Sequence, residues 1–135
     1  MTLPIGYLID SDFTNGTLNR ILRPALIMIK AGNCKFCKIT EPIFRQLNNQ
    51  SRNFNLFFMR PFDGRDPREQ KTKHMLYDIV ETTDFGFPTF VYYTEEGKKF
   101  VNVGSMTLEE MKQFVQTSEQ SLEMTTELSF KPYNI

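Results

Sequence analysis

The chain has 135 residues, the length of about one domain, and its 16 Lys and Arg residues balance 16 Asp and Glu residues. A neutral chain that is 40% hydrophobic favours a packed globule over a disordered segment, and it gives no reason to expect nucleic acid or an anionic membrane as a partner. No apolar run approaches the ~18 residues of a membrane-spanning helix, and the first residues lack the basic and apolar regions of a secretory signal. We therefore expect a cytoplasmic protein.

The first part of the chain predicts a short strand, a helical turn, a buried strand and a long helix. Residues 4–10 suit an edge strand, and residues 12–22 suit a capped helical turn that ends at Arg23, because the residue before a proline avoids the helical conformation. Residues 25–30 are apolar and rich in β-branched side chains, which predicts a buried strand. Residues 35–50 predict a helix, whose apolar positions at helical spacing are Ile39, Ile43, Phe44 and Leu47.

The second part alternates apolar and polar segments in the same way, and it ends in a stretch rich in Ser, Thr and Glu. We predict a domain over residues 1–117 and a C-terminal tail over residues 118–135. The strand and helix order predicts an α/β fold with a mixed sheet flanked by helices. The predicted elements are a strand at 54–60, a loop at 61–67, a helix at 68–81, a turn at 82–86, a hairpin of strands 87–93 and 98–103, and a helix opened by the capping box of Thr107 and Glu110.

Cys34 and Cys37, the only cysteines of the chain, stand where the strand over 25–30 ends and the next helix begins. The first turn of a helix has N–H groups without helical partners and the positive end of the macrodipole, so it stabilises an anion such as a thiolate. Thiolate fraction controls the reactivity of a cysteine, and Lys35 and Lys38 add positive charge nearby. This placement favours dithiol chemistry.

Two other interpretations of the cysteine pair remain open from the residues alone. Tetrahedral zinc needs four ligands, and His74 is the only other histidine or cysteine in the chain, so a second copy would have to supply the rest. The pair can also be two buried structural thiols. His74 itself suits a solvated helix residue better than a ligand or a base, and we expect no metal ion.

Four features appear in the order in which the thioredoxin superfamily carries them. The Cys-Lys-Phe-Cys motif lies at a strand-to-helix junction, Pro42 follows Cys37 by five residues, Phe87-Pro88-Thr89 opens a late strand, and Val103-Gly104 ends the hairpin before the last helix. Over residues 24–117 the chain resembles this superfamily.

The resemblance implies a thioredoxin fold and a protein disulfide oxidoreductase that needs no cofactor beyond its own dithiol. Cys34 would be the nucleophile and Cys37 the resolving thiol, and Pro88 would follow a cis peptide bond. The implied partners are proteins or small molecules that carry a disulfide or dithiol, together with a reductase or oxidase that recycles the enzyme. The residues implied to line the substrate groove are Asn33, Lys35, Phe36, Phe87, Pro88 and Thr89. Phe36 is either an exposed apolar contact or a buried side chain.

The sequence also departs from the family pattern. Asn33 stands where the family has a tryptophan, Met28 stands at the position of a buried aspartate, and Met59 stands at the position of its accompanying lysine. The segment between Asp63 and Phe87 is longer than in a minimal thioredoxin. The alternative function is therefore a redox-inactive binding or structural module, whose inserted segment and tail engage a partner.

Overall fold

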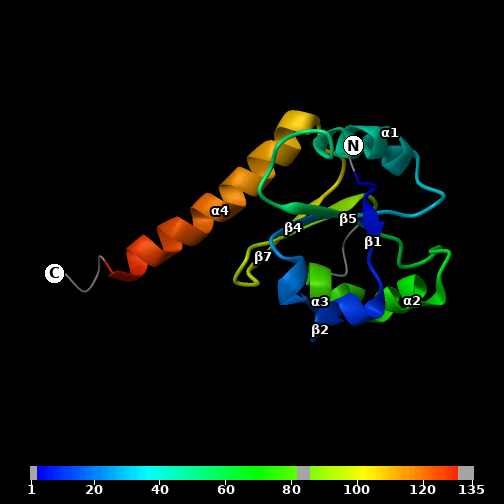
Figure 1. Ribbon diagram of the computed structural model, residues 1–135, viewed down its shortest axis with the longest axis horizontal. Helices are drawn as coiled ribbons and strands as arrows, with labels where there is room; N and C mark the ends of the chain where they lie inside the picture. The colour runs from blue at the N-terminus through cyan, green and yellow to red at the C-terminus, as the bar shows by residue number, and fades with distance from the viewer. Residues whose placement is uncertain (1–2, 82–85, 131–135) are drawn as a thin grey trace.

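The structure, a computed structural model, describes residues 3–81 and 86–130, with side chains through residue 121. Within these residues, five strands form a mixed sheet in the order β1-β5-β4-β6-β7 (Figure 1). Strands β1, β5 and β4 run parallel to one another, and β6 and β7 are antiparallel to their neighbours. The predicted α/β class and the mixed sheet are confirmed. The strands are β1 (Gly6–Tyr7), β4 (Ala25–Ile29), β5 (Asn55–Met59), β6 (Thr89–Tyr93) and β7 (Lys99–Val103).

Strand β4 is the centre of the sheet, and all of its residues are fully buried. Its last residue, Ile29, pairs with Met59 on one side and with Thr89 on the other. The loop that follows β4 therefore emerges beside the end of β5 and the start of β6. This register brings three distant stretches of sequence together at one edge of the sheet.

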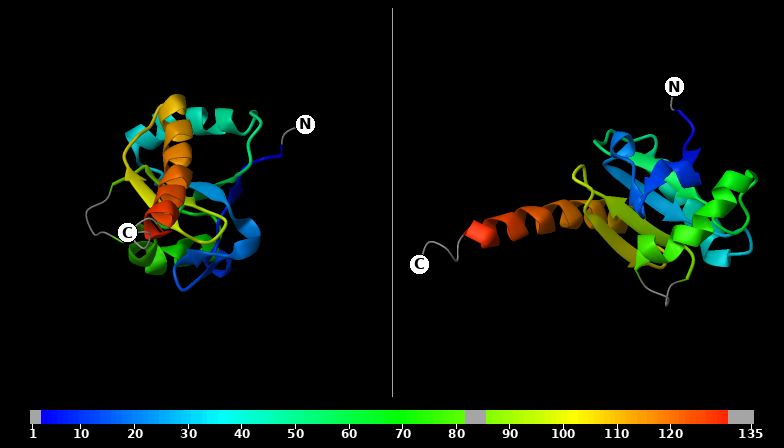
Figure 2. Two further views of the ribbon diagram at one scale, coloured as in Figure 1. Left: turned by 90° about the vertical axis from the view of Figure 1, so that its left-hand side faces the viewer. Right: turned by 90° about the horizontal axis from the view of Figure 1, so that it is seen from below.

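Helices cover both faces of the sheet, which is why β4 is apolar throughout rather than alternating. Helices α1 (Lys35–Leu47) and α4 (Leu108–Phe130) cover one face, and α2 (Pro67–Gln70) and α3 (Leu76–Val80) cover the other (Figures 1 and 2). Alternate residues of β4 point into the two resulting cores. Leu26 and Met28 pack with Phe44, Phe58, Phe90 and Met111, whereas Ala25, Ile27 and Ile29 pack with Leu76, Ile79 and Tyr93.

The helical turn predicted over residues 12–22 is wrong for most of its length. A small hairpin of β2 (Phe13–Thr14) and β3 (Thr17–Leu18) occupies it. The turn residues Asn15 and Gly16 both have positive φ, 51° and 76°, as a two-residue Asn-Gly hairpin turn requires. Single 3₁₀ turns, η1 (Asp10–Asp12) and η2 (Arg20–Leu22), flank the hairpin.

The helix predicted over residues 68–81 is divided into α2, the 3₁₀ segment η3 (Lys71–Met75) and α3. A capping box opens α2: the Asp66 carboxylate accepts from the Arg68 N–H, and the Glu69 carboxylate accepts from the Asp66 N–H. Residues 82–85 of the predicted turn at 82–86 lie outside the described residues.

Helix α4 begins at the predicted capping box, in which the Thr107 N–H donates to Glu110 Oε1 and the Glu110 N–H donates to Thr107 Oγ1. It continues as far as Phe130 and extends away from the sheet (Figures 1 and 2). The predicted tail is therefore helical over residues 118–130, and residues 131–135 lie outside the described part. Contacts with the domain also pass residue 117, because Tyr92 Oη donates to Glu119 Oε1 at 2.6 Å. Of the helices described, none is long and apolar enough to span a membrane.

Candidate active site

Cys34 and Cys37 are joined by a disulfide at the start of α1. Cys34 is the N-cap residue, with an extended backbone, and its Sγ accepts a hydrogen bond from the Cys37 N–H at 3.1 Å. Cys34 is half-buried, whereas Cys37 is only 2% exposed. A thiolate at Cys34 would keep this N–H donor and the positive end of the helix dipole, so the more accessible sulfur is also the one that the helix stabilises as an anion.

The loop before β6 lies against Cys34. Cys34 Sγ is 3.4 Å from the Phe87 carbonyl oxygen, and the Phe87–Pro88 peptide bond is cis. The Gly104 N–H donates to the Pro88 carbonyl at 2.9 Å, which ties this loop to the end of β7. Thr89 is fully buried, and its hydroxyl donates to the Gly86 carbonyl. The buried Thr89 side chain therefore holds the loop through this hydrogen bond and is not part of the surface around Cys34.

Aromatic side chains stand around the disulfide. Phe36, whose burial the residues alone left open, is 60% exposed. Phe62 is 55% exposed, and its ring meets the ring of Phe87 edge to face at 5.8 Å between centroids. The sequence analysis did not identify Phe62. Its position three residues after the end of β5 could have indicated it, because β5 pairs with β4 and the loops after the two strands lie side by side. Asn33 and Lys35 are exposed beside the cysteines.

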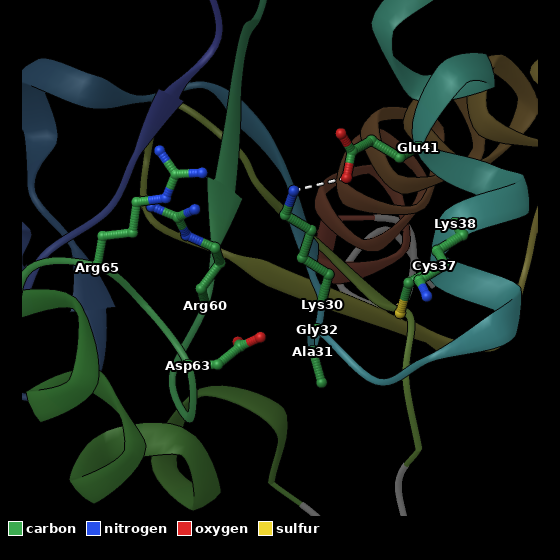
Figure 3. A pocket seen from close by; sticks show the side chains of 9 residues that line it. All are labelled: Lys30, Ala31, Gly32, Cys37, Lys38, Glu41, Arg60, Asp63 and Arg65. Carbon is green, nitrogen blue, oxygen red and sulfur yellow. Dashed lines mark hydrogen bonds and ion pairs between the residues drawn. The ribbon is translucent and has the colours of Figure 1, made fainter.

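A pocket of about 330 Å³ adjoins the buried side of the disulfide. Figure 3 shows residues of the loop after β5 on one side of it, residues of α1 on the other, and residues that follow β4 between them. Four of the lining side chains are cations and two are carboxylates. The pocket is lined by Lys30, Ala31, Gly32, Cys37, Lys38, Glu41, Arg60, Asp63 and Arg65.

Lys30, directly after β4, is part of a partly buried ion-pair network. Only 12% of its side chain is exposed; its ammonium contacts Glu41 Oε1 at 2.5 Å and lies 4.2 Å from the centre of the Phe58 ring. Glu41 also accepts from Arg45. Burial alone would raise the pKa of Glu41, but hydrogen bonds from Lys30 and Arg45 outweigh it and hold that pKa below its usual value.

A second ion pair anchors the loop that carries Phe62. The Arg60 guanidinium donates to both carboxylate oxygens of Glu69, at 2.9 and 3.0 Å, and it also stacks over the Tyr7 ring. Glu69 is 4% exposed and accepts from the Asp66 N–H as well. Burial would raise the pKa of Glu69, but the bonds from Arg60 and Asp66 lower it. The pair closes the loop between the end of β5 and the start of α2, and so holds one wall of the pocket in place.

Met28 and Met59, the two departures from the family pattern inside the sheet, are both fully buried. Met28 belongs to the same apolar cluster as Cys37, which also contains Phe44, Phe58 and Phe90. His74 is exposed on η3, as expected for a solvated residue. Among the described residues, no three His, Cys, Asp or Glu side chains are grouped closely enough to hold a metal ion.

Comparison with solved structures gives confident matches to several proteins, each aligned over at least three quarters of this chain. The Malassezia sympodialis thioredoxin Mala s 13 matches with a TM-score of 0.57 and 18% identity, covering 84% of this chain and 90% of that one. The thioredoxin of Aeropyrum pernix matches with a TM-score of 0.51 and 20% identity, covering 78% and 88%. A secreted Mycobacterium tuberculosis disulfide oxidoreductase homologous to Escherichia coli DsbE matches with a TM-score of 0.50 and 15% identity, covering 76% and 83%.

No protein-family model matches the sequence, and no curated protein matches it either. The structural likeness, at 15 to 20% identity, establishes the fold. The chain has the thioredoxin fold, as its resemblance to that superfamily implies.

Proposed function

We propose that the protein is a thiol-disulfide oxidoreductase that exchanges disulfides with protein or small-molecule substrates through Cys34 and Cys37. The observation that carries the proposal is the asymmetry of the pair. One sulfur is accessible, accepts an N–H bond at the start of a helix and lies against the loop of Pro88. The other sulfur is buried one turn later, within disulfide-bonding reach of the first. Nucleophile and resolving thiol need this arrangement.

In the reducing direction, the Cys34 thiolate attacks one sulfur of the substrate disulfide. A mixed disulfide forms, and the other substrate sulfur leaves as a thiolate. Cys37, as a thiolate, then attacks Cys34 Sγ, which forms the Cys34–Cys37 disulfide and releases the second substrate sulfur. Two electrons pass from the protein dithiol to the substrate, and each departing thiolate takes up a proton from solvent. The same steps in reverse oxidise a substrate dithiol.

The surface around Cys34 supports the binding roles. Phe36 and Phe87 present apolar contacts, and Asn33 and Lys35 present polar ones beside the reactive sulfur. Backbone next to Pro88 would pair with an extended substrate, in the manner of an added strand, with Thr89 holding that loop. Phe62 joins this set because its ring contacts Phe87. The proposal includes no cofactor beyond the dithiol, a cytoplasmic location, and a reductase or oxidase that recycles the pair.

Insulin reduction in the presence of dithiothreitol tests the proposal. The protein should speed insulin precipitation well above the dithiothreitol background, and Cys34→Ser should return the rate to that background. Equal rates for the two proteins would overturn the proposal and favour the redox-inactive binding module, for which the projecting helix α4 would offer a surface (Figure 1).

A further inference from the structure

Positive charge gathers beside the disulfide, although the chain as a whole has equal numbers of cations and anions. The pocket next to Cys37 is lined by four cationic side chains and two carboxylates, an excess of two positive charges. Lys35, between the cysteines, adds another exposed cation. The charges of this neutral chain are therefore unevenly distributed, and the surface beside the disulfide carries an excess of cations.

Two of these cations are already engaged inside the protein. Lys30 is paired with Glu41, and Arg60 is paired with Glu69 in two hydrogen bonds. Lys35, Lys38 and Arg65 are different, because they are exposed and form no ion pair with any residue that the structure describes. Against these three stands Asp63, the exposed carboxylate on the loop wall, whose side chain points into the pocket in Figure 3.

The position of these cations relative to Cys34 determines which residues of a bound polypeptide they can contact. Lys38 follows Cys34 by four residues, about 6 Å along a helix axis at 1.5 Å per residue. An extended chain advances about 3.3 Å per residue, so a polypeptide that is joined to Cys34 and runs along α1 brings side chains about two residues from its own cysteine level with Lys38. Arg65 lines the same pocket on the wall opposite α1. A substrate chain that is joined to Cys34 and extends over this pocket therefore meets Lys38 on one wall and Arg65 on the other.

Resting on the proposed function, we propose that this face selects disulfide-bearing polypeptides in which Asp or Glu stands within about two or three residues of the reactive cysteine. The substrate carboxylates lie on Lys38 and Arg65, and an adjoining apolar residue packs on the Phe62–Phe87 ring pair. Complementary charge raises the rate of encounter and disfavours partners of like charge. Asp63 repels the same substrate carboxylates and so weakens the preference for acidic polypeptides.

The test compares two synthetic peptides that share one cysteine, activated as a disulfide with neutral thiopyridine. One carries two Glu residues two positions from the cysteine on either side, and the other carries two Lys residues there. Each rate with the reduced protein is divided by the rate with dithiothreitol, which removes the intrinsic difference between the peptides. An exposed ion pair changes an equilibrium or rate by roughly 1.5- to 5-fold, so two such contacts predict a preference of about tenfold for the acidic peptide. Raising the salt to about 0.5 M should reduce it to about twofold, because the screening length falls well below 10 Å.

Variants identify the residues responsible. Lys38→Gln with Arg65→Gln should lower the low-salt preference to about twofold, and Asp63→Asn should increase it. The matched control is Lys71→Gln with Lys73→Gln, which removes the same charge from two exposed lysines of η3 that do not line the pocket, and it should leave the preference unchanged.

Each contrary outcome has its own meaning. Equal normalised rates for the two peptides, or a preference that survives Lys38→Gln with Arg65→Gln, would overturn the charge selection while leaving the oxidoreductase proposal in place. Failure to react with either peptide, when dithiothreitol reacts with both, would overturn both proposals together.

Discussion

Replacing Met28 by aspartate tests what limits the second half of the exchange. Cys37 is buried, and Met28 in the same apolar cluster cannot accept a proton, so formation of the Cys37 thiolate has no carboxylate at this position to assist it. Met28→Asp would place one there. We expect the resolving step near pH 7 to become about tenfold faster, which is less than the roughly 10²–10⁴-fold that a well-placed base supplies.

The same substitution should destabilise the protein. Met28 is fully buried against Phe44, Phe58 and Phe90. Losing its burial costs roughly 1.5–3 kcal/mol, and a desolvated carboxyl without a partner costs roughly 1–3 kcal/mol more. The free energy of unfolding should therefore fall by about 2.5–6 kcal/mol, a large part of the roughly 5–15 kcal/mol of a typical domain. Urea unfolding followed by circular dichroism measures this fall, and burial should keep the pKa of the new carboxyl high.

Met28→Asn is the matched control, because asparagine has the size of aspartate but does not ionise and cannot accept a proton near neutral pH. Both variants are loaded with a mixed disulfide at Cys34, and the decay of that species is followed across pH. The mixed disulfide should decay faster in Met28→Asp than in Met28→Asn, in conditions where both variants remain folded. Equal rates would show that the missing carboxylate does not limit the step.

Two further outcomes follow from the site. Cys37→Ser should accumulate a mixed disulfide with substrate whereas Cys34→Ser should not, and iodoacetamide should alkylate Cys34 first in the reduced protein; first alkylation of Cys37 would reverse the two roles. Glu69→Ala should lower the free energy of unfolding by about 3 kcal/mol at neutral pH, because it leaves the Arg60 guanidinium unpaired. Since the pKa of Glu69 is lowered on folding, this contribution is complete above the unfolded pKa of ~4.3 and is lost as the pH falls through the lower folded value. A difference between wild type and Glu69→Ala that stayed constant down to pH 2 would contradict this linkage.

The parts of the fold that the sequence predicted correctly are those with long, regular patterns. The apolar runs of β4 and β5 and the helical spacing of α1 extend over enough residues to identify each element. The position of the cysteines between β4 and α1 follows from the same patterns, and so does the capping box at Thr107. The strands β2 and β3 have two residues each, too few for a periodic signal, although Asn15-Gly16 carried the turn chemistry that marks the hairpin.

Two of the features that sequence reasoning missed depend on tertiary contacts, and a third is the continuation of a helix. Lys30 is partly buried because it contacts Glu41 on α1 and the Phe58 ring on β5. Both partners are distant in the sequence, so no local pattern around Lys30 predicts these contacts. Phe62 lies in a loop whose composition is typical of a turn. Its position near the disulfide depends on the pairing of β5 with β4 and on its contact with the Phe87 ring. The helix over residues 118–130 continues a well-capped helix through polar residues, where apolar periodicity gives little signal.

In the proposed function, Cys34 and Cys37 form one reversible redox couple. Three features stabilise a Cys34 thiolate and so make the disulfide more oxidising: the N-terminus of α1, Lys35 and Lys38. The two lysines are exposed, so water screens them and the shift they produce is tens of millivolts. For this two-electron couple ~30 mV corresponds to ~1.4 kcal/mol. The potential should therefore lie above the ~−270 mV of thioredoxin, nearer the glutaredoxin range of ~−200 to −230 mV.

Equilibration of the protein in glutathione redox buffers, followed by counting of free thiols, measures this couple directly. We expect a single two-electron transition that releases both thiols together, with a midpoint above ~−270 mV. A midpoint at or below ~−270 mV would refute the charge argument and give the protein the potential of a general reductant. Thiols that show no transition across the whole range of buffers would show that Cys34 and Cys37 do not form a reversible redox couple.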